Sequence, residues 1–487
     1  MYERDSKRKL RIKLTFTYAA MILTTLGLLV VAVFIAQGYR FNSRDGKIEQ
    51  GGMIQFDSIP NGAEIQLDTV KLANRTPTRI TATAGNHTVT VSRDGYAPWQ
   101  KQVAVKPGSV LWLNYIRLVP LEPKTATAAT FSGLSSAAAS PNRERFALIS
   151  DEKQPAITFI KVNDSSVDRT TVNLDENSYT APAENGAQSF SLLGWDKESK
   201  RVIVKHAYDD SAEYIVAALD GTAQNITKQF GVSIAKFYFD PTDSQAAYVL
   251  TATREIRRLN LSAATLSGPL VSNASDLTVA YNGWVGFATH PDESGARTVG
   301  YVSKGKLTPI TVQTFSDQTD KSLGFAIGRY YNEMYHLVVT GDHATIYKGD
   351  MPESDAKTLP QFKTIAKLSL AENVAHAGFS PHEQRFVYVQ NGRNIVTYDL
   401  ELSSIATVSS SAALQTEVAW LDSHHLLSVA GGVVEFADYD GTNTQTLAHD
   451  AVSTVAFVST NNKYFYYFAA SGDSEIRLVR LSMTTEK

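Results

Sequence analysis

The pattern of apolar and polar residues divides the chain into one long apolar segment and many short alternating ones. Leu14 to Ala36 contains 23 residues without a charge. A helix of that length spans about 34 Å, which is enough to cross the hydrocarbon core of a bilayer. The alternative is a cleaved secretory signal, whose apolar region is usually shorter and ends at a small-x-small site. Because Phe34-Ile35-Ala36 places a large aromatic there, the pattern predicts an uncleaved transmembrane helix over 14–36.

The charges beside this helix predict its orientation. Residues 1–13 contain six Lys/Arg against two Asp/Glu, and the positive-inside rule keeps such a tail in the cytoplasm. The bulk of the chain is therefore expected outside the cytoplasm, with the bilayer itself as a partner through Leu14 to Ala36. Residues 37–50 are polar and predict a juxtamembrane spacer.

From residue 51 to 120 the chain alternates between short strands and turn residues. In His87-Thr-Val-Thr-Val-Ser92 the two valines point one way and the polar residues the other, which is typical of a half-buried strand. Turn chemistry separates the strands, as at Pro60-Asn61-Gly62 and Asp94-Gly95. About 70 residues of this kind predict one small β-sandwich.

The motifs of this segment resemble the PEGA domain family. They are Pro60-Asn61-Gly62-Ala63-Glu64-Ile65, Thr76-Pro77-Thr78-Arg79-Ile80, Gly85-Asn86-His87-Thr88-Val89 and Asp94-Gly95-Tyr96. Asn61 stands where the family name implies Glu, a change that a turn position tolerates. The resemblance implies a compact, extracytoplasmic, non-catalytic module of prokaryotic surface and envelope proteins, with no active residues to transfer.

Residues 121–487 contain a repeat, and this repeat predicts the fold. Similar apolar strands recur eight times, about 45 residues apart, beginning at Arg145, Arg201, Gln245, Arg297, Met334, Arg385, His425 and Lys463. Each is followed by a second alternating strand, and no helical period intervenes. This pattern predicts a β-propeller of eight blades, or of seven if two repeats are merged. We expect a strand over Ala126 to Phe131 to complete the last blade, since closing the ring stabilises stacked blades.

Two of the repeats carry a turn that resembles the TolB-like propeller family. Phe379-Ser380-Pro381 precedes Arg385-Phe386, and Ala139-Ser140-Pro141 precedes Arg145-Phe146. The fourth and fifth repeats depart most from this pattern and are assigned on strand pattern alone. The resemblance implies a fold and carries no function with it.

Composition narrows the functional classes. The formal net charge is −3, and removing residues 1–13 leaves −7, which argues against a nucleic-acid-binding surface. The chain has no cysteine, which excludes disulfides, Cys nucleophiles and Cys-ligated zinc.

No motif for catalysis, a cofactor or a metal is found. The sequence lacks a Gly-x-Ser-x-Gly elbow, a P-loop, a Gly-x-Gly-x-x-Gly loop and an EF-hand loop. His382-Glu383 lacks the second His of a zinc helix, and His424-His425 is expected to point to opposite faces. We therefore expect no catalytic, cofactor-binding or metal-binding residues, and the sequence leaves the ligand-binding residues unassigned.

Three groups of side chains are weaker candidates. Acidic residues gather in expected loops, where they are either solvated charges or the carboxylate pair of a hydrolase; they are Asp209-Asp210, Asp292-Glu293 and Asp350, Glu353 and Asp355. Trp99 and Trp112 either fill a core or form a platform for sugars. The aromatic runs at 330–331 and 464–467 are expected to lie half within blade cores.

These observations favour a single-pass membrane protein of a prokaryotic cell envelope. It would carry a PEGA-like β-sandwich and a TolB-like propeller that binds envelope protein or polysaccharide without catalysis. An envelope glycan or peptide hydrolase with carboxylates at the propeller mouth is one alternative. A purely structural spacer is another.

Overall fold

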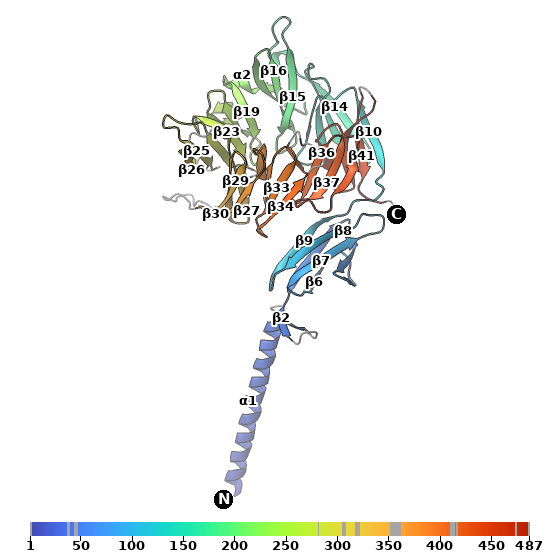
Figure 1. Ribbon diagram of the computed structural model, residues 1–487, viewed down its shortest axis with the longest axis vertical. Coiled ribbons are helices and arrows are strands. Elements are labelled where there is room, and N and C mark those ends of the chain that lie inside the picture. Colours follow the sequence, from blue (N-terminus) through green and yellow to red (C-terminus); the bar gives the residue numbers. More distant parts are fainter. Residues whose placement is uncertain are drawn as a thin grey trace. The chain divides into compact units, whose positions relative to one another are not determined.

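The computed structural model describes residues 2–36, 39–42, 47–280, 282–303, 308–316, 322–350, 362–409, 414, 417–472 and 475–485. The chain divides into two compact units, residues 1–122 and 123–487. We describe each unit by itself (Figure 1).

The first unit begins with the helix α1 (Tyr2–Ala36). Its segment Ile12–Ile35 has a mean hydropathy of 2.4 and no buried residues, so it is long and apolar enough to cross a membrane. A signal sequence would meet the same criterion. Within the expected spacer, β1 (Tyr39–Asn42) and β2 (Lys47–Gln50) form an antiparallel pair.

Seven strands of the first unit form two sheets around one core. One sheet has the order β6-β3-β9, and the other has the order β5-β4-β7-β8. Their bounds are β3 (Gly52–Ile59), β4 (Glu64–Leu67), β5 (Val70–Lys71), β6 (Thr78–Ala82), β7 (Gly85–Ser92), β8 (Trp99–Val105) and β9 (Val110–Arg117). Val89 and Val91 are fully buried in this core, as the alternation in β7 predicts. Gly62 and Gly95 have φ values of 78° and 82°, which explains glycine at these two turns.

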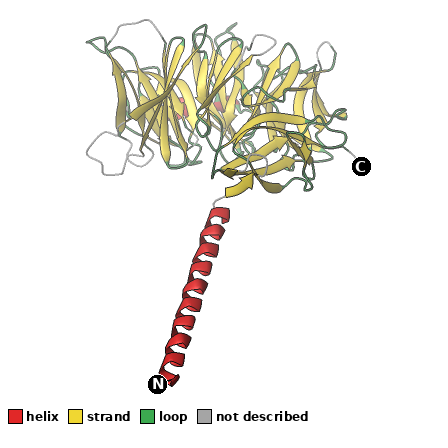
Figure 2. Ribbon diagram, turned by 60° about the horizontal axis from the view of Figure 1, so that its bottom comes forward, coloured by secondary structure: helices red, strands yellow, loops and turns green. Residues whose placement is uncertain are grey.

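The second unit is a β-propeller, which confirms the predicted fold class. Within the described residues of this unit, eight four-stranded sheets follow one another as blades around a ring (Figure 1), and Figure 2 shows their strands in yellow, joined by green loops. We number them from blade 1, which contains β11 to β14, to blade 8, which contains β39 to β41. Seven of the blades are formed by four consecutive strands.

The strands occupy four positions in each blade. The first, innermost strands are β11 (Ser136–Ala139), β15 (Gln188–Trp195), β19 (Ile234–Phe239), β23 (Ala274–Val279), β27 (Leu323–Tyr330), β31 (His376–Phe379), β35 (Ala419–Trp420) and β39 (Phe457–Val458). The second strands are β12 (Arg145–Ile149), β16 (Arg201–Tyr208), β20 (Ala246–Thr251), β24 (Val285–Thr289), β28 (Glu333–Thr340), β32 (Phe386–Gln390), β36 (His425–Ala430) and β40 (Tyr464–Ala470).

The third and fourth strands form the outer half of each blade. The third strands are β13 (Ala156–Val162), β17 (Ser211–Ala218), β21 (Ile256–Asn260), β25 (Arg297–Val302), β29 (His343–Asp350), β33 (Asn394–Asp399), β37 (Val433–Asp438) and β41 (Ile476–Ser482). The fourth strands are β14 (Val167–Asn173), β18 (Ala223–Asn225), β22 (Thr265–Leu266), β26 (Pro309–Phe315), β30 (Phe362–Ser369), β34 (Ser404–Ser409), β38 (Gln445–Ala448) and β10 (Thr125–Phe131). Two short helices lie between blades. The helix η1 (Glu176–Ser178) connects β14 to β15, and α2 (Ile226–Phe230) connects β18 to β19.

The alignment of the fourth repeat was wrong by one strand. The segment beginning at Arg297 is the third strand of blade 4, and the second strand is β24, Val285–Thr289. This repeat was assigned on strand pattern alone, and that pattern does not distinguish β24 from β25, because both strands are apolar and largely buried.

Blade 8 is completed by a strand from the beginning of the unit, as expected. β10 pairs antiparallel with β41, from Thr125 opposite Leu481 to Phe131 opposite Ile476. Phe131 is buried, with its ring 6.4 Å from that of Phe468. The ring of Phe146 in blade 1 stacks on that of Phe457 in blade 8 at 4.3 Å, so the first and last blades share one core.

The turns between first and second strands place side chains at one face of the propeller. Five of these turns begin with a buried serine or aspartate, and these are Ser140, Asp196, Asp240, Ser380 and Ser459. Asp196 accepts hydrogen bonds from the backbone of Lys200 and Arg201, at 2.9 and 3.2 Å, and Ser140 accepts one from Arg145 at 2.9 Å. These bonds satisfy backbone groups that the turn would otherwise leave unpaired.

Candidate binding site

A cavity of about 980 Å³ lies at the face of the propeller where these turns gather. Its lining comes from blade 1 (Pro141), blade 2 (Leu193), blade 3 (Tyr238) and blade 6 (His382). Because blades 2 and 6 lie across an eight-bladed ring from each other, the cavity spans the mouth of the central channel. We call it the channel-mouth cavity.

The floor of the channel-mouth cavity is apolar and rigid. Tyr214 donates a hydrogen bond to the carbonyl of Ala235 at 2.8 Å, and its ring stacks on Phe237 with centroids 6.2 Å apart. Trp195 donates its indole N–H to the carbonyl of Ala138 at 3.0 Å, which ties blade 2 to blade 1. Both residues are buried, so the floor is held by packing between blades.

Two apolar side chains of the cavity remain open to solvent. Leu193 is 49% exposed and Tyr238 is 38% exposed. The register of β15 shifts between Leu192 and Gly194, and this bulge leaves Leu193 directed away from the blade core. Burial raises the pKa of the Tyr238 hydroxyl, so it is a neutral donor at ordinary pH.

The charged side chains of the lining are three lysines, Lys197, Lys205 and Lys236. Lys236 pairs with Asp276, with Nζ 2.6 Å from Oδ1. Partial burial alone would lower the pKa of Lys236, but this ion pair outweighs it and raises the pKa. Lys197 donates to the carbonyl of Thr242 at 2.7 Å. Among the described residues that line the cavity, none is a carboxylate.

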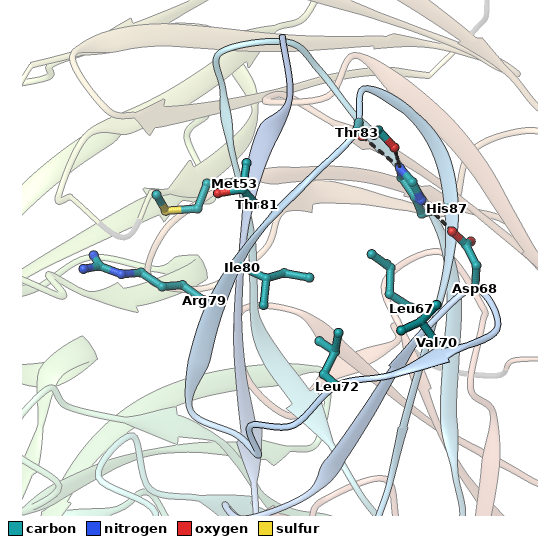
Figure 3. A pocket seen from close by; sticks show the side chains of 10 residues that line it. All are labelled: Met53, Leu67, Asp68, Val70, Leu72, Arg79, Ile80, Thr81, Thr83 and His87. Carbon is teal, nitrogen blue, oxygen red and sulfur yellow. Dashed lines mark hydrogen bonds and ion pairs between the residues drawn. The ribbon is translucent and has the colours of Figure 1, made fainter. Parts of the chain in front are cut away.

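A second hollow, of about 700 Å³, opens between the two sheets of the first unit. Figure 3 shows Leu67, Leu72 and Ile80 pointing toward one another across it, whereas Met53 and Arg79 point away. On its rim, His87 Nδ1 lies 2.8 Å from Asp68 Oδ2, and Nε2 lies 2.9 Å from the carbonyl of Thr83 (Figure 3). Partial burial opposes protonation of His87, but these two acceptors outweigh it and raise its pKa. The polar groups of this rim therefore satisfy one another.

Most of the residues that the sequence singled out lie apart from both hollows. Trp99 is a core residue, 2% exposed, whereas Trp112 is 42% exposed, so the two indoles do not form a joint platform. Asp209 accepts from the backbone of Ala183 at 3.1 Å, and Asp292 caps its own turn. Glu353 and Asp355, and the side chain of Asp350, lie outside the described residues.

The histidine and aromatic candidates have structural partners. His425 Nδ1 lies 2.7 and 2.8 Å from the two carboxylate oxygens of Asp422, and His424 packs on the ring of Phe386. The described part of the chain contains no group of three or more His, Asp or Glu side chains that could hold a metal. Tyr330 is buried and Tyr331 exposed, and Phe465, Tyr466 and Tyr467 are buried in blade 8.

Sequence reasoning missed the residues of the channel-mouth cavity. A partial signal was present, because Lys236 and Tyr238 alternate with Phe237 and Phe239 in a strand whose other face is buried. In a closed propeller, the open side of an innermost strand faces the channel. The sequence identified His382 only as part of an incomplete zinc motif, yet it lines the cavity.

Comparison with known proteins identifies one domain of the first unit. The PEGA domain family matches residues 52–120, which span the two packed sheets. These residues are a PEGA domain. Among curated proteins, none matches the chain in sequence.

Solved structures similar to the chain include several propellers. A structure of oligogalacturonate lyase in complex with manganese is 10% identical, with a TM-score of 0.41, and the match covers 69% of this chain and 99% of that one. The Dos1 propeller is 12% identical, with a TM-score of 0.45 and coverage of 74% and 96%. The β-propeller domain of Cps50 (Swd1) from Myceliophteria thermophila is 11% identical, with a TM-score of 0.39 and coverage of 74% and 100%. At these identities and TM-scores, none of them assigns a ligand or a reaction to this chain.

Proposed function

We propose that this protein is a membrane-anchored binding or scaffold protein of the cell envelope, whose propeller binds envelope protein or glycan outside the cytoplasm without catalysis. The observation that carries the proposal is the channel-mouth cavity. Its volume of about 980 Å³ and its rigid apolar floor with a few charged groups are typical of ligand sites.

The location rests on the first unit. An apolar helix long enough to cross a membrane follows a tail with six Lys/Arg, an arrangement that favours a cytoplasmic N-terminus. The PEGA domain follows that helix after the spacer 37–50, and the family resemblance implies a module of envelope proteins. Both features favour display of the propeller on the outer side of the membrane.

The hydrolase alternative is less well supported at this cavity. Glycoside hydrolysis commonly needs two carboxylates about 5–9.5 Å apart at the scissile bond. The described lining of the channel-mouth cavity contains no carboxylate. A spacer, for its part, needs no open cavity with Leu193 and Tyr238 exposed in it.

Site-specific photocrosslinking in living cells tests the binding role. A photoreactive amino acid at Leu193 of the full-length protein in its own membrane should give discrete adducts. The matched control is Ile405 in β34, an apolar residue that is 56% exposed on an outer strand, and it should give few. Equal or absent adducts at both positions would favour a spacer. Turnover of envelope glycan or peptide by the full-length protein would contradict the absence of catalysis.

A further inference from the structure

We infer that the channel-mouth cavity binds an acidic segment of a polypeptide, in which carboxylates alternate with apolar side chains. This inference rests on the proposed function, since it requires that the cavity is a binding site, and it goes further by naming the chemistry of the ligand.

The charge of the lining differs from that of the unit that contains it. Residues 123–487 contain 30 Lys/Arg and 40 Asp/Glu, a formal net charge of −10. The cavity nevertheless presents three lysines and, among the described residues that line it, no carboxylate. A cationic cavity in an acidic unit attracts negative groups selectively, because clefts focus the field of the charges that line them.

One of the three lysines, Lys205, has no carboxylate beside it. Lys236 is paired with Asp276, whereas Lys197 donates to the carbonyl of Thr242 and acts electrostatically on the neighbouring Glu198, whose carboxylate is ion-paired with Lys200. Lys205 is half-buried, and within the described part of the chain its ammonium makes no hydrogen bond or ion pair. A half-buried ammonium is stabilised by an anionic partner, and a ligand carboxylate would supply one.

One further acidic side chain, Glu417, lies outside the lining of the cavity. Glu417 acts electrostatically on Tyr238, and its carboxylate already accepts a hydrogen bond from the hydroxyl of Tyr388. The cationic side of the cavity is therefore formed by Lys197 and Lys205, both from blade 2.

The apolar groups beside these lysines favour a peptide over a saccharide. Leu193 and Tyr238 expose apolar surface next to the cationic side, and covering such surface is favourable by about 25 cal/mol per Å². A polypeptide can place a leucine or phenylalanine there and a carboxylate two residues on. An acidic saccharide would satisfy the lysines but would leave the Leu193 side chain against hydroxyl groups.

Fluorescence anisotropy with the full-length protein in detergent provides the test. The probe is a labelled octapeptide of glutamate and leucine, and the comparators are the same peptide with glutamine or lysine in place of glutamate. The glutamate peptide should bind at least tenfold more tightly than either comparator, since charge-assisted hydrogen bonds are the strong ones. Its affinity should fall as salt is raised to about 1 M, where the Debye length is about 3 Å.

Charge-removing variants locate the binding. Lys205→Gln and Lys197→Gln should each weaken the glutamate peptide about tenfold, the effect of losing one charge-assisted contact. Lys205→Arg should retain most of the affinity. The matched control Lys161→Gln removes an exposed charge from β13 in blade 1 and should change nothing. Lys197 is exposed, so its variant keeps the test valid if Lys205→Gln alters folding.

The outcomes separate this inference from the proposed function. If the three peptides bind equally, or if both glutamine variants bind like the control, the inference is overturned. If an oligogalacturonate binds at the cavity in place of the peptide, a glycan is the ligand and the peptide inference is wrong, while the binding role stands. If no probe binds but Leu193 still gives crosslinks in cells, the inference fails and the proposed function survives.

Discussion

Replacing Phe131 by alanine should weaken the closure of the propeller ring, because this side chain joins the borrowed strand β10 to the core of blades 8 and 1. Phe131 is only 9% exposed, and its ring lies 6.4 Å from that of Phe468. The guanidinium of Arg169, from blade 1, lies 4.7 Å above the ring, and Arg169 also donates to the carbonyl of Thr130 at 3.0 Å. Truncation therefore affects the contacts that hold both sides of the closure.

The expected cost follows from the burial of the ring. Phe→Ala substitutions in cores cost about 3–5 kcal/mol, and we take the lower end, about 3 kcal/mol, because β10 is an outermost strand. The unfolding entropy near the midpoint is about 2.1 cal/mol/K per residue, so a unit of roughly 365 residues should lose about 4 °C in Tm.

Differential scanning calorimetry of the full-length protein in detergent measures this shift. The control is Thr127→Ala, which truncates an exposed side chain on the same strand and should lower Tm by less than about 1 °C. In the Phe131→Ala variant, the rate of amide hydrogen exchange should rise together in β12, β40 and β41, on both sides of the closure. Deleting residues 121–133 should destabilise the whole propeller. Equal Tm values for the Phe131 and Thr127 variants, or a deletion that leaves Tm unchanged, would refute this account of the closure.

Three further predictions concern topology, metal dependence and acid stability. Protease added to cells with permeabilised outer layers should digest the propeller and spare a tag before Leu14; a protected propeller would contradict the proposed orientation. The Tm should be unchanged by reductant, since the chain has no cysteine. It should also be unchanged by chelator, and a large shift in Tm with chelator would reveal a metal site. Burial lowers the pKa of His336 to about 3, so below about pH 6.5 only the unfolded state takes up this proton. The contribution of neutral His336 to the free energy of unfolding is thus complete above pH 6.5 and is lost toward pH 3, by at most about 1.4 kcal/mol per pH unit. The Tm of His336→Phe should therefore fall less than that of the wild type between pH 6 and 4. Equal pH dependence of the two proteins would show that His336 does not titrate in this way.

The parts of the fold that could be predicted from sequence were those with a local signal. Alternation in β7 and turn glycines such as Gly62 predicted one small β-sandwich. The recurrence of buried second strands predicted eight blades and the completion of the last blade by β10. The alignment of blade 4 was wrong because it rested on strand pattern alone, and β24 and β25 are both apolar and largely buried, so the pattern does not reveal which of them is the second strand.

The channel-mouth cavity could not be predicted in the same way. Its lining joins Pro141, Leu193, Tyr238 and His382, which are brought together only by closure of the ring. The exposure of Leu193 depends on the bulge in β15, which no single residue type specifies. Lysines on alternating strands are common on surfaces, so Lys197 and Lys205 become informative only when the absence of carboxylates from the described lining is known.

The completion of blade 8 by β10 also determines the order in which the propeller can mature. The ribosome makes Thr125 long before its partner Leu481, and at about 5–20 residues per second the interval is on the order of 20–70 s. Throughout that time blades 1 to 7 can form while β10 waits with an unpaired edge, available to chaperones, proteases or another copy of the chain. A premature stop anywhere before Ile476 would leave this strand without its partner, so cells should clear truncated chains rather than accumulate propellers with a missing blade.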